Sequence, residues 1–272
     1  MCKFAINTSI FLLLAVFAWV LLSADSVIAN LEEGLIVYFS FDQGENDMVR
    51  DLSNTGNDGI VKGDPKWVDG PAPAFGEGIE FDGVDDYIEV PDNDTLDVGK
   101  GDISFMLWIK QADQQPADHP RPVSKMPLYA TDKPGFDLIT FGKVSQAMQI
   151  FYGMSGATRQ TTNAVRNIVD GQWHHIATMK DDKEIKLYID GEMDSSKPIT
   201  EVDISNDYPF VVGACAQVAA HVMFKGVVDE VAFYNRALTE DEIQMAMKDA
   251  ILSAVEPESK LSTTWGDIKG GY

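Results

Sequence analysis

The chain has 272 residues, with 21 Lys and Arg against 43 Asp and Glu, and a formal net charge of -22 at pH 7. Its hydrophobic content of 45% is that of a globular chain able to bury a core, and it excludes a disordered or collagen-like one. So negative a chain is repelled by nucleic acids and anionic membranes, and we expect no nucleic acid as partner. Cations and neutral sugars remain compatible with it.

The N-terminus has the pattern of an export signal. Lys3 precedes an unbroken apolar run from Ile10 to Leu22. That run is shorter than the ~20 residues that a membrane-spanning helix needs. We expect residues 1–29 to be a signal peptide cleaved after Ala29, with an uncleaved anchor as the alternative. No second run of this kind follows, so the mature chain is predicted to have no membrane span and to be secreted or to lie at the cell surface.

From residue 30 to about residue 234 the hydrophobic pattern has period two. Ile103, Phe105 and Leu107 point one way, whereas Met106 and Trp108 point the other. Such segments, separated by turn residues, predict strands at 34–41, 78–81, 87–90, 103–110, 136–141, 147–152, 174–179, 185–189, 210–212 and 227–234. This pattern predicts an all-β fold, an antiparallel sandwich of two sheets.

Two segments depart from this pattern. Residues 111–135 hold five prolines, which predicts a surface loop with at most a short edge strand at Val123–Lys125. Thr239 followed by Glu242 forms a capping box, which predicts the start of a short C-terminal helix with a hydrophobic stripe. The stripe consists of Ile243, Ala246, Met247 and Ala250. We expect one domain over residues 30–254 and a flexible C-terminal tail over 255–272.

Six segments in sequence order resemble a known family. They are Gly34–Asp42 (GLIVYFSFD), Asp51–Gly59 (DLSNTGNDG), Phe81–Ile88 (FDGVDDYI), Gly171–Ala177 (GQWHHIA), Leu187–Gly191 (LYIDG) and Val228–Thr239 (VDEVAFYNRALT). Together they resemble the LamG-like jellyroll domain of the concanavalin A-like lectin/glucanase superfamily, Laminin G-like 3 type. The resemblance implies two antiparallel sheets packed face to face. Members of the family bind carbohydrates, proteins or calcium, or serve as adhesion modules, so the fold does not by itself define the function.

Acidic and amide side chains suggest a calcium site. Ca²⁺ prefers six to eight oxygen ligands. The candidates are Asp42 at the end of the first strand, Asp51, Asn57 and Asp58 in a glycine-containing loop, and Asp229 in the last strand. In the fold that the resemblance implies, the first and last strands are neighbours, so these groups could converge on a structural Ca²⁺. The alternative is that Asp51, Asn57 and Asp58 only cap turns and that Asp229 pairs with Arg236 or with backbone.

A second acidic cluster lies at Asp82, Asp85 and Asp86. Because Asp is frequent in tight turns, turn chemistry is the preferred interpretation, with a metal site as the alternative. Neighbouring strand residues such as His174 and His175 face opposite sides, which argues against a shared zinc ion.

Catalysis by a glucanase of this superfamily needs acids on one strand face, in the pattern E-x-D-x-E. The nearest match here is Glu201-Val202-Asp203-Ile204-Ser205, in which Ser205 replaces the third acid. Retaining hydrolysis needs two carboxyl groups ~5–5.5 Å apart, so the match lacks an essential group. A sugar-binding platform would need aromatic rings, for which the candidates are Trp67, Trp108, Tyr129, Tyr152 and Tyr208.

The sequence therefore predicts a secreted, non-catalytic binding or adhesion module with a structural calcium ion. Its expected partner is a glycan or an extracellular protein. The alternative is a divergent glycoside hydrolase of the same superfamily.

Overall fold

The computed structural model describes residues 31–252 except 43–46, 113, 117, 128–132, 141–147, 154–159, 202 and 218–221. The predicted signal peptide (1–29) and the predicted C-terminal tail (255–272) lie outside the described residues and stay predictions. Tyr129, a candidate aromatic residue, also lies outside them. Among the described residues no helix is long and apolar enough to cross a membrane.

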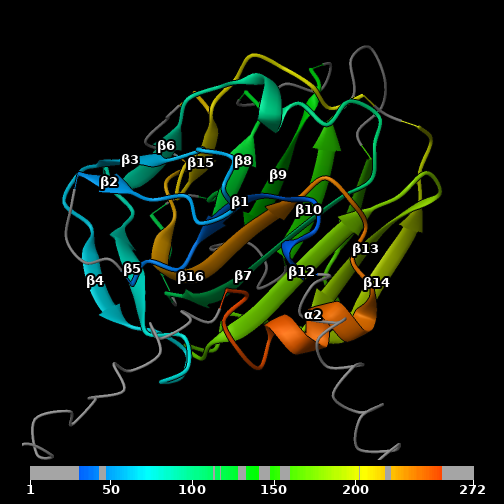
Figure 1. Ribbon diagram of the computed structural model, residues 1–272. Helices are drawn as coiled ribbons and strands as arrows, with labels where there is room; N and C mark the ends of the chain where they lie inside the picture. The colour runs from blue at the N-terminus through cyan, green and yellow to red at the C-terminus, as the bar shows by residue number, and fades with distance from the viewer. Residues whose placement is uncertain are drawn as a thin grey trace, which may run out of the picture.

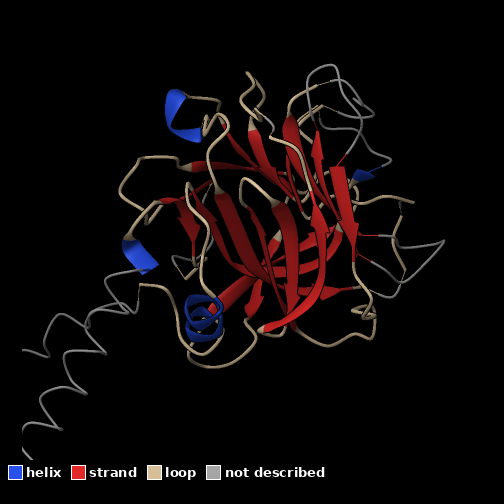
Figure 2. Ribbon diagram, turned by 90° about the vertical axis from the view of Figure 1, so that its right-hand side faces the viewer, coloured by secondary structure: helices blue, strands red, loops and turns tan. Residues whose placement is uncertain are grey.

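Two antiparallel sheets face each other (Figures 1 and 2). The first has the order β14-β13-β12-β7-β16-β5-β4, with β1 also paired to β16. Its strands are β1 (Leu35–Phe39), β4 (Lys66–Asp69), β5 (Glu77–Asp82), β7 (Ile103–Gln111), β12 (His174–Lys180), β13 (Glu184–Ile189), β14 (Glu192–Pro198) and β16 (Lys225–Tyr234). The all-β, two-sheet antiparallel sandwich with a short C-terminal helix is thereby confirmed.

The second sheet has the order β11-β10-β9-β8-β15-β6-β3-β2. Its strands are β2 (Met48–Val49), β3 (Gly59–Lys62), β6 (Tyr87–Val90), β8 (Val123–Lys125), β9 (Gly135–Thr140), β10 (Met148–Gly153), β11 (Gln160–Asn163) and β15 (Phe210–Val212). A short 3-10 helix, η1 (Asp94–Leu96), follows β6.

The core lies between the sheets because each strand turns alternate apolar residues inward. At its centre the rings of Phe105, Phe136, Phe210 and Phe233 lie 5.1 to 6.3 Å apart, from both sheets. Burial of these large rings supplies much of the hydrophobic stabilisation.

A second apolar cluster covers part of the outer face of the first sheet. It joins Tyr38, Met106 and Ala232 to Ile243 and Ala246 of helix α2 (Glu240–Ala246). The helix lies beside β13, where Tyr188 Oη donates to Glu240 Oε1 at 3.4 Å (Figure 1). The predicted capping box is present, but the helix ends at Ala246, before the end of the predicted stripe.

All ten predicted strands are found, and five further strands are not predicted by the hydrophobic pattern: β2, β3, β4, β11 and β14. Four of these five strands lie at sheet edges, and each of the five buries few side chains, so no clear alternation appears. The structure also corrects one expectation. Val123–Lys125 is not an edge strand, because β8 lies between β9 and β15 and its three residues are buried.

The proline-rich segment before β8 is held against the second sheet by a buried ion pair. Arg121 Nε lies 3.1 Å from Asp137 Oδ2 in β9, and Ser124 Oγ donates to Asp137 Oδ1 at 2.5 Å. Both charged side chains are only 3% exposed. The loop is therefore anchored by a paired charge as well as by apolar contacts.

Candidate functional site

Asp229 and Glu230 occupy a β-bulge in β16. The register with β7 shifts between Asp229 and Ala232, and Glu230 has a φ of 53°. Strict alternation would place Glu230 on the face opposite Asp229. The extra residue instead lets the Glu230 carboxylate reach Tyr38 Oη, which donates to Glu230 Oε2 at 2.6 Å on the outer face of the sheet. The bulge therefore gathers two acids on one face.

The Asp229 carboxyl group is fully buried and only half satisfied. Its Oδ1 accepts a hydrogen bond from Glu230 N at 2.8 Å, whereas its Oδ2 has no hydrogen-bond donor among the described residues. Desolvation by burial, then repulsion from Glu230 and Asp42, raises the pKa of Asp229 to about 9. Such an oxygen is costly to leave unpaired, and a cation would compensate that cost.

Asp42 lies beside this group at the end of β1. Phe41 has a φ of 58°, which turns the chain out of the strand, and Asp42 Oδ1 accepts from Glu77 N at 2.9 Å. Two glycines leave room for the carboxylates of Asp42 and Asp229. A Cβ added at Gly76 would lie 1.8 Å from Asp42 Oδ1, and one added at Gly70 would lie 2.6 Å from Asp229 Oδ2 and 2.9 Å from Gly76 O.

Glu230 borders the same acidic centre. Its Oε1 is buried without a hydrogen-bond partner among the described residues. Desolvation raises the pKa of Glu230 to about 7, although the hydrogen bond from Tyr38 opposes the rise. Trp108, the register partner of Asp229, packs against Phe75 and His175 with ring centroids 5.5 and 5.2 Å apart. Trp108 is thus part of a packed wall and does not form an open platform.

Asp51 and Asn57 serve a different place in the fold. Asp51 accepts hydrogen bonds from Tyr38 N, Ser53 N and Asn57 N at 3.0, 2.9 and 2.9 Å, and from the Ser53 and Thr55 hydroxyl groups at 2.8 and 2.9 Å. These bonds use both carboxylate oxygens to fix the loop on β1.

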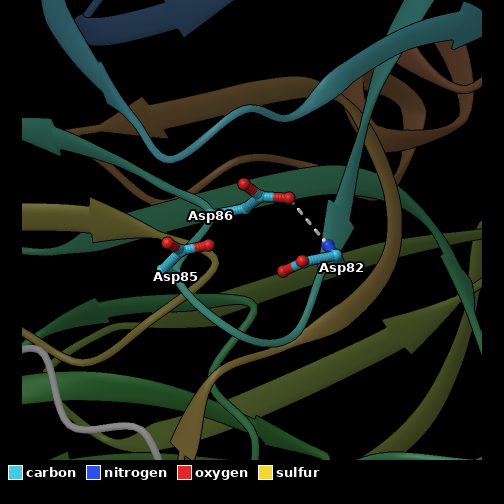
Figure 3. Close-up of side chains that lie close together, drawn as sticks. All are labelled: Asp82, Asp85 and Asp86. Atoms are coloured by element: carbon cyan, nitrogen blue, oxygen red, sulfur yellow. Dashed lines mark hydrogen bonds between the residues drawn. The ribbon is translucent and has the colours of Figure 1, made fainter.

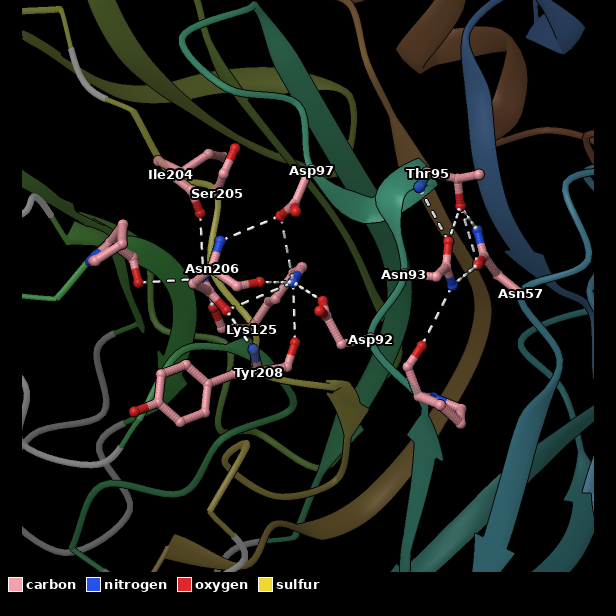
Figure 4. A network of polar contacts seen from close by, with 12 residues as sticks. Asn57, Asp92, Asn93, Thr95, Asp97, Lys125, Ile204, Ser205, Asn206 and Tyr208 are labelled. Atoms are coloured by element: carbon pink, nitrogen blue, oxygen red, sulfur yellow. Dashed lines mark hydrogen bonds and ion pairs between the residues drawn. The ribbon is translucent and has the colours of Figure 1, made fainter.

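Asn57 is engaged just as completely. Its Nδ2 donates to Ile36 O at 2.7 Å, and its Oδ1 accepts from Asn93 Nδ2 at 2.7 Å and from Thr95 Oγ1 at 3.1 Å. Figure 4 shows Asn57, Asn93 and Thr95 turned toward one another. Among the predicted ligands, the structure places Asp42 beside Gly76 and Asp229 beside Gly70, and it places Asp51 and Asn57 in a network that braces the loop.

The second acidic cluster does form, since ligand atoms of Asp82, Asp85 and Asp86 lie within 4.8 Å of one another (Figure 3). Its carboxylates, however, accept backbone N–H groups. Asp86 accepts from Asp82 N at 2.9 Å and Asp64 N at 2.8 Å, and Asp82 accepts from Val84 N at 2.7 Å. These contacts are turn chemistry that joins the β5–β6 turn to the loop after β3.

The hydrophobic pattern does not reveal the buried amine of Lys125. Its Nζ lies 2.7 Å from Asp92 Oδ1 and donates to the carbonyls of Asn206 and Tyr208 at 2.8 and 2.9 Å (Figure 4). The side chain is 1% exposed. Lys125 therefore ties β8 to two loops, a role that only the tertiary contacts define.

The nearest match to the glucanase motif is not on a strand of the described residues. Glu201 is exposed and pairs with Lys100 at 3.4 Å, while Asp203 Oδ1 accepts from Ser205 N at 3.0 Å. The alternation that would align two carboxyl groups on one strand face is thus not realised.

Several solved structures share this fold. The binding domain of Paraclostridial Mosquitocidal Protein 1 has a TM-score of 0.61 and 18% identity, covering 80% of this chain and 52% of that one. Domain 4 of AbnA, a GH43 extracellular arabinanase from Geobacillus stearothermophilus solved with arabinotriose, has a TM-score of 0.60 and 22% identity, covering 78% and 97%. The binding domain of Botulinum neurotoxin DC with SialylT has a TM-score of 0.59 and 12% identity, covering 80% and 52%.

The chain therefore spans about half the length of these toxin binding domains and nearly the whole arabinanase domain. No curated protein matches it. The family model described as concanavalin A-like lectin/glucanases superfamily, Laminin G 3, matches residues 82–244, more than half of the chain. The chain belongs to this family of the concanavalin A-like lectin/glucanase superfamily.

Proposed function

We propose that this protein is a non-catalytic, extracytoplasmic binding module for a glycan or a protein. The observation that carries the proposal is a shared fold. The botulinum neurotoxin DC binding domain has this fold and was solved in complex with SialylT and with rat synaptotagmin II, and domain 4 of AbnA has it and was solved in complex with arabinotriose. Identities of 22% or less make these likenesses evidence for the fold, and the ligand class is our inference from it. The export-signal pattern of residues 1–29 and the extracellular arabinanase support the location.

Hydrolysis is the less favoured alternative. Two carboxyl groups must flank the glycosidic bond at a defined separation. Glu201 is exposed and paired with Lys100, and Asp203 caps the turn that contains Ser205. Neither side chain has the buried, paired environment that tunes one carboxyl group as an acid.

Binding and hydrolysis are separated by one experiment on arabinan, xylan and β-glucan. Affinity electrophoresis of the mature protein measures retardation by each polysaccharide, and a reducing-end assay on the same mixtures measures cleavage. Retardation without new reducing ends supports a binding module for glycans. Release of reducing ends contradicts our proposal, and the variant Glu201→Gln then tests whether Glu201 is responsible.

We further propose that Asp42 and Asp229 hold a structural Ca²⁺. The donor set is of the right kind, since the Asp42 carboxylate lies beside Gly76 and the Asp229 carboxylate lies beside Gly70, near the Gly76 carbonyl. Asp229 Oδ2 is a buried oxygen without a donor among the described residues. Glycine at positions 70 and 76 leaves the space that a Cβ would fill. Asp51 and Asn57 then act indirectly, by fixing the loop on β1.

The calcium proposal predicts a sign reversal in the variant Asp229→Asn. The folded-state pKa of Asp229 lies near 9, above its unfolded value. As pH rises from about 4 to 9, Asp229 ionises in the unfolded chain while it stays protonated in the folded one, so the folded protein loses stability. In EDTA at pH 8, Asp229→Asn should therefore melt at or above the wild-type midpoint. With Ca²⁺ at a hundredfold excess over its dissociation constant, the wild type should gain ~2.7 kcal/mol and the variant should not.

Thermal melts with EDTA and with added CaCl₂ measure this effect. The matched control is Asp85→Asn, which removes an exposed acid of the other cluster and should keep the full calcium response. A wild-type midpoint that calcium leaves unmoved contradicts the site. If calcium raises the midpoint of Asp229→Asn as much as that of the wild type, the ion binds at a different site.

A further inference from the structure

A groove lies at the end of the sandwich where the chain crosses from one sheet to the other. Residues 63–65 join β3 of the second sheet to β4 of the first, and a cavity of about 360 Å³ lies along this crossover. That volume is at the lower end of the ~300–1,000 Å³ typical of small-ligand sites. It suits a short stretch of a ligand and is too small for a folded partner.

The groove combines an aromatic surface with a polar rim. Trp67, Val61 and the buried Pro65 supply its apolar part. Trp67 is half-buried. It pairs with the core residue Ile79 in the sheet register and packs against the core, and it also lines the groove. The exposed side chains of Asp47, Asp64 and Lys66 line its polar rim.

The walls of the groove are held rigidly. Val61 N donates to Asp47 O, and Asp64 N donates to Asp86 Oδ1, at 2.9 and 2.8 Å. Gly63 has a φ of 76°, and a Cβ there would lie 2.3 Å from Asp86 Oδ1. The acidic turn of Figure 3 thus positions the crossover loop. Because these walls are already ordered, little conformational entropy is lost when a ligand binds.

We infer that this groove binds a short segment of a neutral saccharide, with the sugar ring against Trp67 and its hydroxyl groups at Asp47, Asp64 and Lys66. The inference rests on the proposed binding function and names a site for it. The carboxylates can accept hydrogen bonds from sugar hydroxyl groups, and the Lys66 ammonium can donate hydrogen bonds to sugar hydroxyl oxygens. The rim therefore matches a hydroxyl group both as a donor and as an acceptor. The apolar C–H face of a sugar matches the flat indole. A net charge of -22 disfavours anionic sugars.

The experiment titrates the full mature protein with arabinotriose, xylotriose, cellotriose and laminaritriose, by calorimetry and by the NMR shift of indole N–H groups. Trp67→Leu keeps apolar bulk for the core and removes the flat ring. We expect it to weaken binding at least tenfold and to delete the indole signal that moves in the wild type. The double variant Asp64→Asn with Lys66→Gln changes only exposed side chains and should weaken binding several-fold. It keeps the proposal testable if Trp67→Leu fails to fold.

Asp69→Asn is the matched control, since Asp69 is exposed on the same strand and does not line the groove. It should bind as the wild type does. Wild-type binding that survives both groove changes overturns the groove and leaves the binding function standing elsewhere on the molecule. A wild type that binds none of the four trisaccharides at millimolar concentration also overturns the groove. In that case the polysaccharide retardation assay decides separately whether the module binds glycans at all.

Discussion

At the scale of single residues, His175 is a buried imidazole in the packed wall around Trp108. Its side chain lies beside Trp108 in the register of β12 and β7 and is 2% exposed. Desolvation lowers the pKa of His175 to about 4, although Asp190 partly opposes the shift. The ring is therefore neutral in the folded protein at pH 7 and becomes protonated near pH 6.5 only when the chain unfolds.

This difference predicts a pH-dependent stability. A histidine with a lowered folded-state pKa contributes stability above the unfolded pKa, and the contribution is lost as pH falls from 6.5 toward 4. The difference in unfolding free energy between wild type and His175→Gln should shrink by up to ~1.4 kcal/mol per pH unit below 6.5. Urea unfolding at pH 7.5, 6.5 and 5.5 measures it. A difference that is constant across these pH values contradicts a neutral buried ring.

Carboxylates titrating elsewhere cancel in this comparison, because both proteins carry them. His174→Gln is a suitable control. The pKa of His174 is raised by its hydrogen bonds to Asp190 and Asp170, against desolvation, so its dependence on pH should have the opposite sign.

At the scale of elements, helix α2 depends on its N-terminal cap. Thr239 Oγ1 accepts from Glu242 N at 3.2 Å, and Glu242 in turn accepts from Thr239 N at 2.8 Å and from Arg236 at 2.8 Å. Glu242 is 3% exposed, so the cap is also an ion pair against the sheet. A helix of one or two turns cannot form by propensity alone, and it needs this cap and the packing of Ile243 on the sheet.

The cap predicts a specific loss. Thr239→Ala should lower the unfolding free energy by ~0.5–2 kcal/mol, because one backbone N–H at the start of the helix loses its acceptor. Thr239→Ser keeps the hydroxyl group and should remain within a few tenths of the wild type. Chemical denaturation of the three proteins measures both effects. Equal losses in the Ala and Ser variants would assign the effect to the Thr239 methyl group.

The strands also show where the alternating hydrophobic pattern can and cannot predict an element. The ten strands with one face on the core were predictable because period two follows directly from burial of one face. β14, with the sequence EMDSSKP, is exposed along most of its length and carries no such signal. The bulge at Glu230 breaks the alternation from within, so the outer-face position of that acid depends on the pairing of β16 with β7.

At the scale of the whole molecule, the net charge of -22 acts on every conformational state. Like charges on a compact surface repel one another, and unfolding relieves that repulsion. Salt screens such interactions, with a Debye length of about 10 Å at 0.1 M. The net charge therefore opposes the stability that the core supplies.

Raising NaCl from 20 to 300 mM in EDTA should thus raise the melting midpoint. Thermal melts at pH 7.5 measure it, and KCl should give the same rise, since screening depends on ionic strength and not on the cation. A midpoint that falls with salt would mean that favourable exposed ion pairs, such as Lys100 with Glu201, outweigh the net repulsion.

What the sequence determined by itself is the class of fold and the inventory of chemical groups. Alternation fixed the inward faces of the main strands, the capping box at Thr239 and Glu242 fixed the helix start, and the six motifs indicated the family that the match over residues 82–244 establishes. These features are local, because each follows from spacing along a few residues.

The tertiary structure decided which groups meet. Asp42 and Asp229 are 187 positions apart, and they come near enough for their charges to interact because β1 pairs with β16. Asp51 and Asn57 are nearer to Asp42 in sequence, but their side chains hydrogen-bond to β1 and to the start of η1. The Trp67 groove exists only because the chain crosses between the sheets at residues 63–65. Contacts over such separations depend on sheet pairing, bulges and glycine clearance, and no short-range pattern in the sequence encodes them.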